Sequence, residues 1–125
     1  MDIAYDPHPD DAPDPGEVVW AWVPYEDDPT QGKDRPVLVI GRQGETLVAV
    51  GLTSKDHDRD MQQEADEGRF WFDVGTGPWD SKGRSSEVRL NRLLTVDPTD
   101  VRRIGAVLDK PRFDAVVAAL EPYLP

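Results

Sequence analysis

Residues 36–52 read PVLVIGRQGETLVAVGL, two aliphatic runs separated by a short polar stretch with glycine at 41 and 44. Runs of this kind on both sides of a glycine-containing turn are typical of a β-hairpin. The first run is fully apolar and begins with Pro36, at a position where the missing N–H is tolerated. We therefore expect a hairpin over residues 36–52, with its turn at 41–44, at the centre of the fold.

Further short apolar segments lie on both sides of this hairpin. They are residues 18–23, 69–74, 86–90, 92–96 and 104–108. The first of them, VVWAWV, is apolar on both alternating faces. Such a strand needs a core beneath it and a second partner, either another segment or another subunit, above it. The aromatic side chains of residues 69–74 favour a strand there as well.

A helix is expected near the C-terminus. Asp109 can cap it, and Pro111 then falls in the first turn, where proline is favoured. An amphipathic stripe follows, formed by Phe113, Val116, Val117 and Leu120. Short strands at regular spacing with one terminal helix predict a mainly β fold, a small SH3-like β-barrel.

The first fifteen residues differ from the rest of the chain. They contain five aspartates, four prolines, few apolar groups and no Lys or Arg. A segment of this composition cannot offset the entropy of ordering by burying apolar surface. We therefore expect residues 1–15 to be an acidic, Pro-rich disordered tail and residues 16–125 to form a single domain.

The formal net charge of the 125 residues is −11. This charge argues against a general nucleic-acid binder, because attraction to phosphates needs clustered Lys and Arg. The charge is uneven, however, since eight Lys and Arg oppose four Asp and Glu between Lys82 and Arg112. A polarised surface can hold a short anionic ligand, although solvated charges on sheet and helix surfaces give the same pattern.

Several classes of protein are disfavoured by composition. Cysteine is absent, which excludes disulfides and thiolate metal sites. No run of about 18 apolar residues is present, so we expect no membrane span. The acidic N-terminus lacks the basic start and apolar run of a signal peptide. A cytoplasmic protein is the expectation.

Two weaker candidate sites lie between residues 52 and 69. Acidic side chains follow a calcium-loop spacing at Asp56, Asp58, Asp60, Glu64 and Glu67. Met61 stands where that loop needs glycine, so a solvated acidic loop is favoured over a calcium site. His57, between two aspartates, is either a proton carrier or an exposed loop histidine.

The sharpest constellation lies at the open end of the hairpin. Residues 31–36 read QGKDRP and place Arg35 at the mouth of the first strand. The planar guanidinium matches the geometry of a phosphate, and Gly32 permits close approach of the backbone. Thr53 and Ser54 end the second strand, and their hydroxyl groups can donate to the same anion.

An in-register hairpin brings Arg35 and Thr53 out at the same end, where they would form an anion site. A second interpretation is open at this point. Arg35 would then be a surface residue paired with Asp34 or Glu26, and residues 53–54 would only cap a turn.

Several stretches occur in an order that is known from one family. They are GEVVW at 16–20, DPT at 28–30, QGKDRPVLV at 31–39, LTSK at 52–55, SEVRL at 86–90, LLTV at 93–96 and RIG at 103–105. In this order and spacing they resemble the PemK/MazF family of toxins from bacterial toxin–antitoxin pairs. The resemblance extends over residues 16–121 and implies a compact SH3-like barrel that forms homodimers.

The resemblance also implies an activity. It suggests an endoribonuclease toxin that cleaves single-stranded RNA without a metal or cofactor and is inhibited by an antitoxin protein. Arg35 would stabilise the phosphate and Thr53 would assist, while the 2′-OH of the RNA attacks and leaves a 2′,3′-cyclic phosphate. The residues expected to bind the substrate are Gln31, Gly32, Lys33, Ser54, Lys55, Trp22 and Trp79. The tryptophans, and Tyr25, would either stack on bases or belong to the core.

One departure from the family pattern concerns the general base. Many members carry a carboxylate just before the glutamine of the first loop, where this chain has Thr30. The candidates that remain for a base are Glu26, Asp28, Asp34 and His57. A catalytically inactive module of the same fold, which contacts RNA or protein without cleavage, is therefore the alternative function. An unrelated SH3-like interaction domain is a third.

Overall fold

The structure, a computed structural model, describes residues 1–54 and 66–125. Its strands are β1 (Asp2–Ile3), β2 (Glu17–Pro24), β3 (Gly32–Gln43), β4 (Thr46–Thr53), β5 (Trp71–Gly75), β6 (Ser86–Val96) and β7 (Val101–Val107). Its helices are η1 (Pro98–Asp100), α2 (Lys110–Leu120) and η2 (Glu121–Tyr123). The predicted combination of many strands with one C-terminal α-helix is confirmed.

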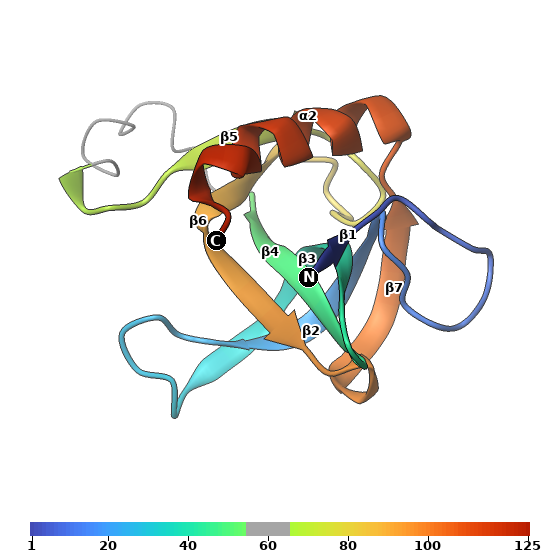
Figure 1. The fold of residues 1–125 in the computed structure, drawn as a ribbon, viewed down its shortest axis with the longest axis horizontal. Coiled ribbons are helices and arrows are strands. Elements are labelled where there is room, and N and C mark those ends of the chain that lie inside the picture. Colours follow the sequence, from blue (N-terminus) through green and yellow to red (C-terminus); the bar gives the residue numbers. More distant parts are fainter. Residues whose placement is uncertain (55–65) are drawn as a thin grey trace.

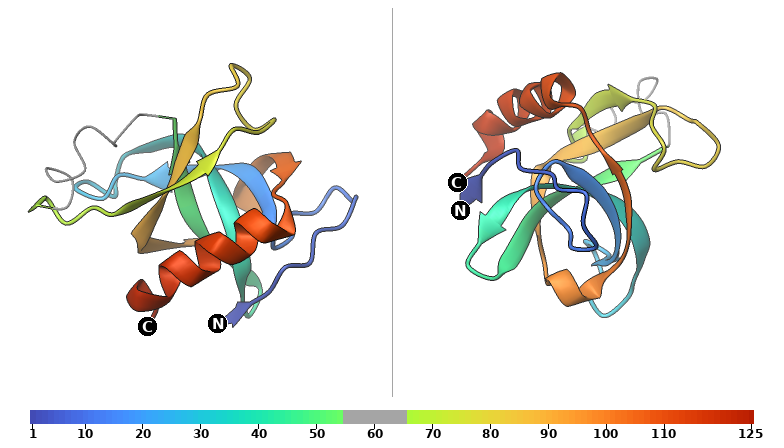
Figure 2. Two further views of the ribbon diagram at one scale, coloured as in Figure 1. Left: turned by 90° about the horizontal axis from the view of Figure 1, so that it is seen from above. Right: turned by 90° about the vertical axis from the view of Figure 1, so that its right-hand side faces the viewer.

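All strand pairs are antiparallel, in the order β5-β6-β4-β3-β2-β7, with β1 paired to β3 outside this path. The sheet curls into a small barrel, and α2 lies across one end of it (Figure 1). The views in Figure 2 show the two chain ends side by side, close to β1 and η2. The predicted small SH3-like β-barrel is confirmed.

The central hairpin is formed by β3 and β4. Its strands pair Val37 with Gly51 and Gln43 with Thr46, and a bulge shifts the register between Val39 and Gly41. The predicted turn at 41–44 is therefore displaced toward its C-terminal end, because β3 continues through residue 43. Gly41 is required there, since a Cβ atom would lie 2.2 Å from the backbone oxygen of Asp2 in β1.

The N-terminal part of β2, the middle of β3 and residues 47–50 of β4 are buried on both faces. One cluster, which contains Val18, Leu38 and Val50, packs against α2 through Phe113 and Val116. The alternate residues of the same strands form a second cluster with β6, and it includes Val19, Val37, Val39, Ala49 and Leu94. The expectation that residues 18–23 are covered on two sides is confirmed for the N-terminal part of β2, where Val18 and Val19 are both fully buried.

Residues 1–15 are not the disordered tail that their composition predicts. Ile3 and Tyr5 pack against the core, and the Tyr5 hydroxyl donates to the backbone oxygen of Leu108 at 2.7 Å. The Tyr5 ring also lies 5.0 Å from that of Phe113, measured between centroids. The prediction failed because two apolar side chains and a short strand are enough to dock the segment, although its average composition is acidic.

Two further boundaries differ from the sequence prediction. Residues 86–90 and 92–96 were expected as separate strands, but β6 runs through Asn91 without a break. The first strand of the hairpin was expected from residue 36, but β3 begins at Gly32 and pairs Trp22 with Asp34. The helix cap is as predicted, since the Asp109 carboxylate accepts from the Arg112 backbone N–H at 3.2 Å.

Candidate active site

Arg35 and Thr53 line the same cavity, which has a volume of about 520 Å³. The hairpin register explains why they meet. Val37 lies opposite Gly51, so the antiparallel strands bring position 35 of β3 opposite position 53 of β4. Lys33 and Ser54, also expected from the sequence, line this cavity as well. We call it the Arg35 cavity.

The surroundings of Arg35 distinguish between the two interpretations left open by the sequence. Asp34 pairs with Arg102 of β7, and Glu26 pairs with Arg89 of β6. Within residues 1–54 and 66–125, no carboxylate lies within 4.0 Å of the Arg35 guanidinium. The interpretation of Arg35 as a surface partner of Asp34 or Glu26 is therefore wrong. A half-buried guanidinium in a cavity with no acidic partner there can accept an external anion.

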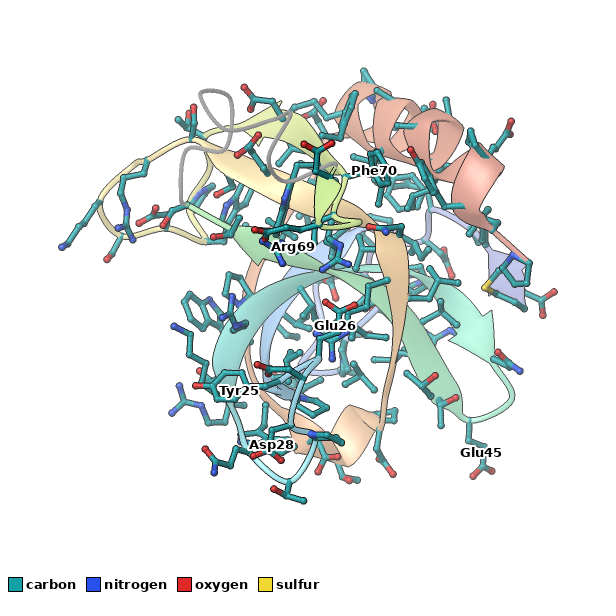
Figure 3. The ribbon with its side chains drawn as sticks, turned by 90° about the vertical axis from the view of Figure 1, so that its left-hand side faces the viewer. Tyr25, Glu26, Asp28, Glu45, Arg69 and Phe70 are labelled. Atoms are coloured by element: carbon teal, nitrogen blue, oxygen red, sulfur yellow. The ribbon has the colours of Figure 1, made fainter. Side chains whose placement is uncertain are left out.

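A second cavity, of about 210 Å³, adjoins the first. Four residues line both cavities: Arg35, Leu52, Arg69 and Trp71. Figure 3 shows Arg69 above Glu26 on this side of the barrel, with Tyr25 and Asp28 in the β2–β3 loop below. We call the two cavities together the groove, and the smaller one the Arg89 cavity because Arg89 forms part of its wall.

The groove is more basic than the chain as a whole. Its basic lining residues are Lys33, Arg35, Arg69, Arg84, Arg89 and Arg92, and its acidic ones are Glu26, Asp27, Asp34 and Asp80. A locally positive concave surface attracts anions even in a protein of net charge −11. The net charge therefore does not argue against a phosphate-bearing ligand at this place.

Two residues that were expected to bind substrate, Gln31 and Gly32, do not line the groove. The Gln31 backbone N–H donates to the Asp28 oxygen at 3.0 Å, and its backbone oxygen accepts from the Tyr25 N–H at 2.8 Å, which closes the β2–β3 loop. At Gly32 a Cβ atom would lie 2.7 Å from the Trp22 ring, so the glycine is needed for strand packing. Lys55 lies outside the described residues.

Of the two roles left open for Trp79, its burial favours the core. Its side chain is 2% exposed, and its indole N–H donates to the Ser86 hydroxyl at 2.9 Å. The Arg112 guanidinium lies 5.7 Å from its ring. Trp79 thus forms part of the wall of the Arg35 cavity but is too buried to offer a free ring face. Trp22 is 51% exposed, yet it lines neither cavity.

Sequence reasoning missed several groove residues. They are Trp20, Arg69, Trp71, Asp80, Ser81, Arg84, Arg89 and Arg92. The excess of basic residues after Lys82 was the available signal for the last three. It could not show which of those side chains face β4 and the β2–β3 loop.

Each candidate base that the structure describes has a partner, although the Oδ1 atom of Asp34 is buried without one. The Arg89 guanidinium lowers the pKa of Glu26, mainly through their hydrogen bonds. Asp28 accepts from both the backbone N–H and the hydroxyl of Thr30, at 3.2 and 2.6 Å. Asp34 lines the Arg35 cavity but is paired with Arg102. His57 lies outside the described residues.

The acidic residues with calcium-loop spacing also lie outside the described residues, except Glu67. In the part of the chain that the structure does describe, no three Asp, Glu or His side chains gather as a metal site. The same part contains no helix that is long and apolar enough to cross a membrane.

The geometry defines a class of protein, a small antiparallel β-barrel with a basic groove beside its central hairpin. A sequence model of one such family, described as PemK-like, MazF-like toxin of type II toxin–antitoxin system, matches residues 14–124. The chain belongs to this family. A comparison with curated protein sequences gives no match.

Solved structures agree with this assignment at the level of the fold. MazF from Deinococcus radiodurans is similar with a TM-score of 0.63 and 21% identity, over 90% of this chain and 96% of that one. A MazE–MazF structure from the same organism gives 0.60 and 20%, over 90% and 96%. The Mycobacterium tuberculosis toxin MazF-mt6 gives 0.55 and 17%, over 86% and 94%.

Proposed function

We propose that the chain is an endoribonuclease toxin that cleaves single-stranded RNA at the Arg35 cavity without a metal. The observation that carries the proposal is the placement of Arg35 and Thr53 in one basic cavity, with no carboxylate partner for Arg35 in the described part of the chain. Membership of the toxin family supports the same conclusion.

The reaction needs few groups from the protein. The 2′-oxygen of the RNA attacks the adjacent phosphorus, the bond from phosphorus to the 5′-oxygen breaks, and a 2′,3′-cyclic phosphate and a 5′-hydroxyl result. Arg35 stabilises the charge that develops on the phosphate oxygens. The Thr53 hydroxyl donates to a phosphate oxygen or to the departing 5′-oxygen. Lys33 and Ser54 hold the flanking backbone in the same cavity.

Proton removal from the 2′-hydroxyl is the step with no assigned residue. Glu26, Asp28 and Asp34 are each tied to another group. This observation favours the second candidate function, a catalytically inactive module that binds RNA or protein in the same groove. The two functions share the site and differ in whether RNA is cut.

The partners follow from the same groove. We propose that an antitoxin inhibits the toxin by laying an extended acidic segment along the basic lining. The existence of a MazE–MazF structure from D. radiodurans supports an antitoxin partner. We also propose a homodimer in the cytoplasm, for which size-exclusion chromatography with light scattering is the test.

Cleavage of a mixed-sequence RNA pool tests the enzyme. Arg35→Ala should lower the cleavage rate about 10²–10³-fold, as loss of one donor to a developing oxyanion does. Thr53→Val removes the hydroxyl at nearly constant shape and should also slow cleavage, whereas Thr53→Ser should retain most of it. Lys110→Ala, on α2 and outside both cavities, is the matched control for a lost cation.

The products and the growth phenotype complete the test. Fragments should end in a cyclic phosphate, and expression of the wild-type chain should arrest bacterial growth. Wild-type protein that binds the pool but leaves it intact would support the inactive module. Equal activity of Arg35→Ala and Lys110→Ala would show that the chemistry lies elsewhere.

A further inference from the structure

The wall of the Arg89 cavity contains an unusual ion pair. Both terminal nitrogens of Arg89 donate to the two carboxylate oxygens of Glu26, each at 3.1 Å. The two partners differ in burial, since the Arg89 side chain is 10% exposed and that of Glu26 is 54% exposed. An exposed acid from a loop thus covers a guanidinium that belongs to the barrel wall.

Arg89 is held in place independently of Glu26. Its Nε atom donates to the Asn91 Oδ1 atom at 2.6 Å, and its guanidinium lies 5.9 Å from the Trp71 ring centroid. Only the outer edge of the guanidinium therefore faces Glu26. That edge presents two parallel N–H groups, the arrangement that binds a carboxylate or a phosphate equally well.

The position of this edge relates it to Arg35. Both guanidinium groups line the Arg89 cavity, together with Arg69 and Arg92. Arg92 in turn donates to the Pro24 backbone oxygen at 2.7 Å and so holds the root of the loop that carries Glu26. An extended RNA strand that leaves the Arg35 cavity along the groove would enter the cavity that Arg89 lines.

We propose that Arg89 is a second phosphate-binding site for the RNA strand, and that Glu26 occupies it as an internal anion until a substrate phosphate displaces the carboxylate. The inference deepens the proposed function and rests on it for the identity of the ligand. Glu26 is an anion at neutral pH, as an internal competitor must be, and the hydrogen bonds from Arg89 lower the pKa of its carboxyl group further.

Glu26→Gln tests the displacement, with Glu45→Gln as the matched control. Both substitutions remove one acidic charge, but Glu45 lies in the β3–β4 turn, outside both cavities and away from Glu26 (Figure 3). The probe is a fluorescent, mixed-sequence oligonucleotide with 2′-O-methyl groups, which cannot be cleaved. Its affinity is measured by anisotropy over a series of salt concentrations.

We expect Glu26→Gln to bind this probe about three- to tenfold more tightly than Glu45→Gln, because no internal anion has to leave. Arg89→Gln should weaken binding and reduce the salt slope by about 0.7, the value for one phosphate on a single strand. Added to Arg89→Gln, the Glu26→Gln change should have no further effect. Arg89→Lys keeps the charge without the fork and guards against a folding defect in Arg89→Gln.

Inorganic phosphate gives a readout that does not depend on RNA. It should raise the melting temperature of Glu26→Gln more than that of Glu45→Gln, and Arg89→Gln should abolish the difference. The proposal is overturned if Glu26→Gln and Glu45→Gln bind the probe equally and respond equally to phosphate, while Arg35→Ala still loses binding. If no variant binds the probe and Arg35→Ala changes nothing, the proposed function fails as well.

Discussion

Replacing Trp79 by Phe tests whether this side chain stabilises the fold or binds the RNA. The substitution removes the hydrogen bond from the indole N–H to Ser86, which contributes about 1 kcal/mol. It also leaves a void of about 40 Å³ in a well-packed site, worth about 1 kcal/mol at the usual cost of a cavity. A weaker contact with the Arg112 guanidinium adds about 0.5 kcal/mol. We expect the free energy of unfolding to fall by about 2–3 kcal/mol.

Urea unfolding followed by far-UV circular dichroism measures this change, and the melting temperature should fall by about 8–12 °C. Trp22→Phe is the control, because Trp22 is half exposed, and it should change the stability by less than about 0.5 kcal/mol. Affinity for the uncleavable RNA probe, measured well below the melting temperature, should change little. A fully stable Trp79→Phe protein with weakened RNA binding would refute the assignment of Trp79 to the core.

Three further predictions concern other parts of the molecule. Burial raises the pKa of Glu17, so protonation stabilises the fold, and this contribution is lost as the pH rises through the raised pKa. Glu17→Gln keeps the acceptor for the Asp14 N–H and should raise the urea midpoint at pH 7 but not at pH 4. Asp109→Ala removes the cap of α2 and should cost about 1 kcal/mol in unfolding free energy, whereas Asp114→Ala should cost less. Tyr5→Ala should cost about 3 kcal/mol and expose the N-terminal segment to proteolysis, and an unchanged digestion pattern would contradict its docking.

The parts of the fold that sequence reasoning predicted are those with local signals. The hairpin follows from two aliphatic runs around a glycine turn, and the start of α2 follows from Asp109 before Pro111. The meeting of Arg35 with Thr53 needed only the register of neighbouring strands. Each of these conclusions depends on residues that are close in sequence or paired across one turn.

What the sequence did not reveal depends on contacts between distant residues. Arg89 reaches Glu26 across 63 positions, and Tyr5 reaches Leu108 across 103. Bulges also decide which side of a strand faces the groove, and register shifts occur in both pairings of β6. The expected gap between residues 86–90 and 92–96 falls at Asn91, whose side chain accepts from the Phe70 N–H and donates to the Gly68 oxygen while β6 continues through it.

The single long strand β6 has a consequence for how such a protein can change its specificity. Arg89 and Arg92 hold the β2–β3 loop, while Asn91 between them accepts from the Phe70 N–H and donates to the Gly68 oxygen. The β2–β3 loop and the segment 68–70 are thus both hydrogen-bonded to residues 89–92 of β6, which include neither Arg35 nor Thr53. Under the proposed function, the β2–β3 loop beyond Pro24 and Glu26 can gain or lose residues and so alter one border of the groove, while Arg35 and Thr53 keep the positions set by the β3–β4 register.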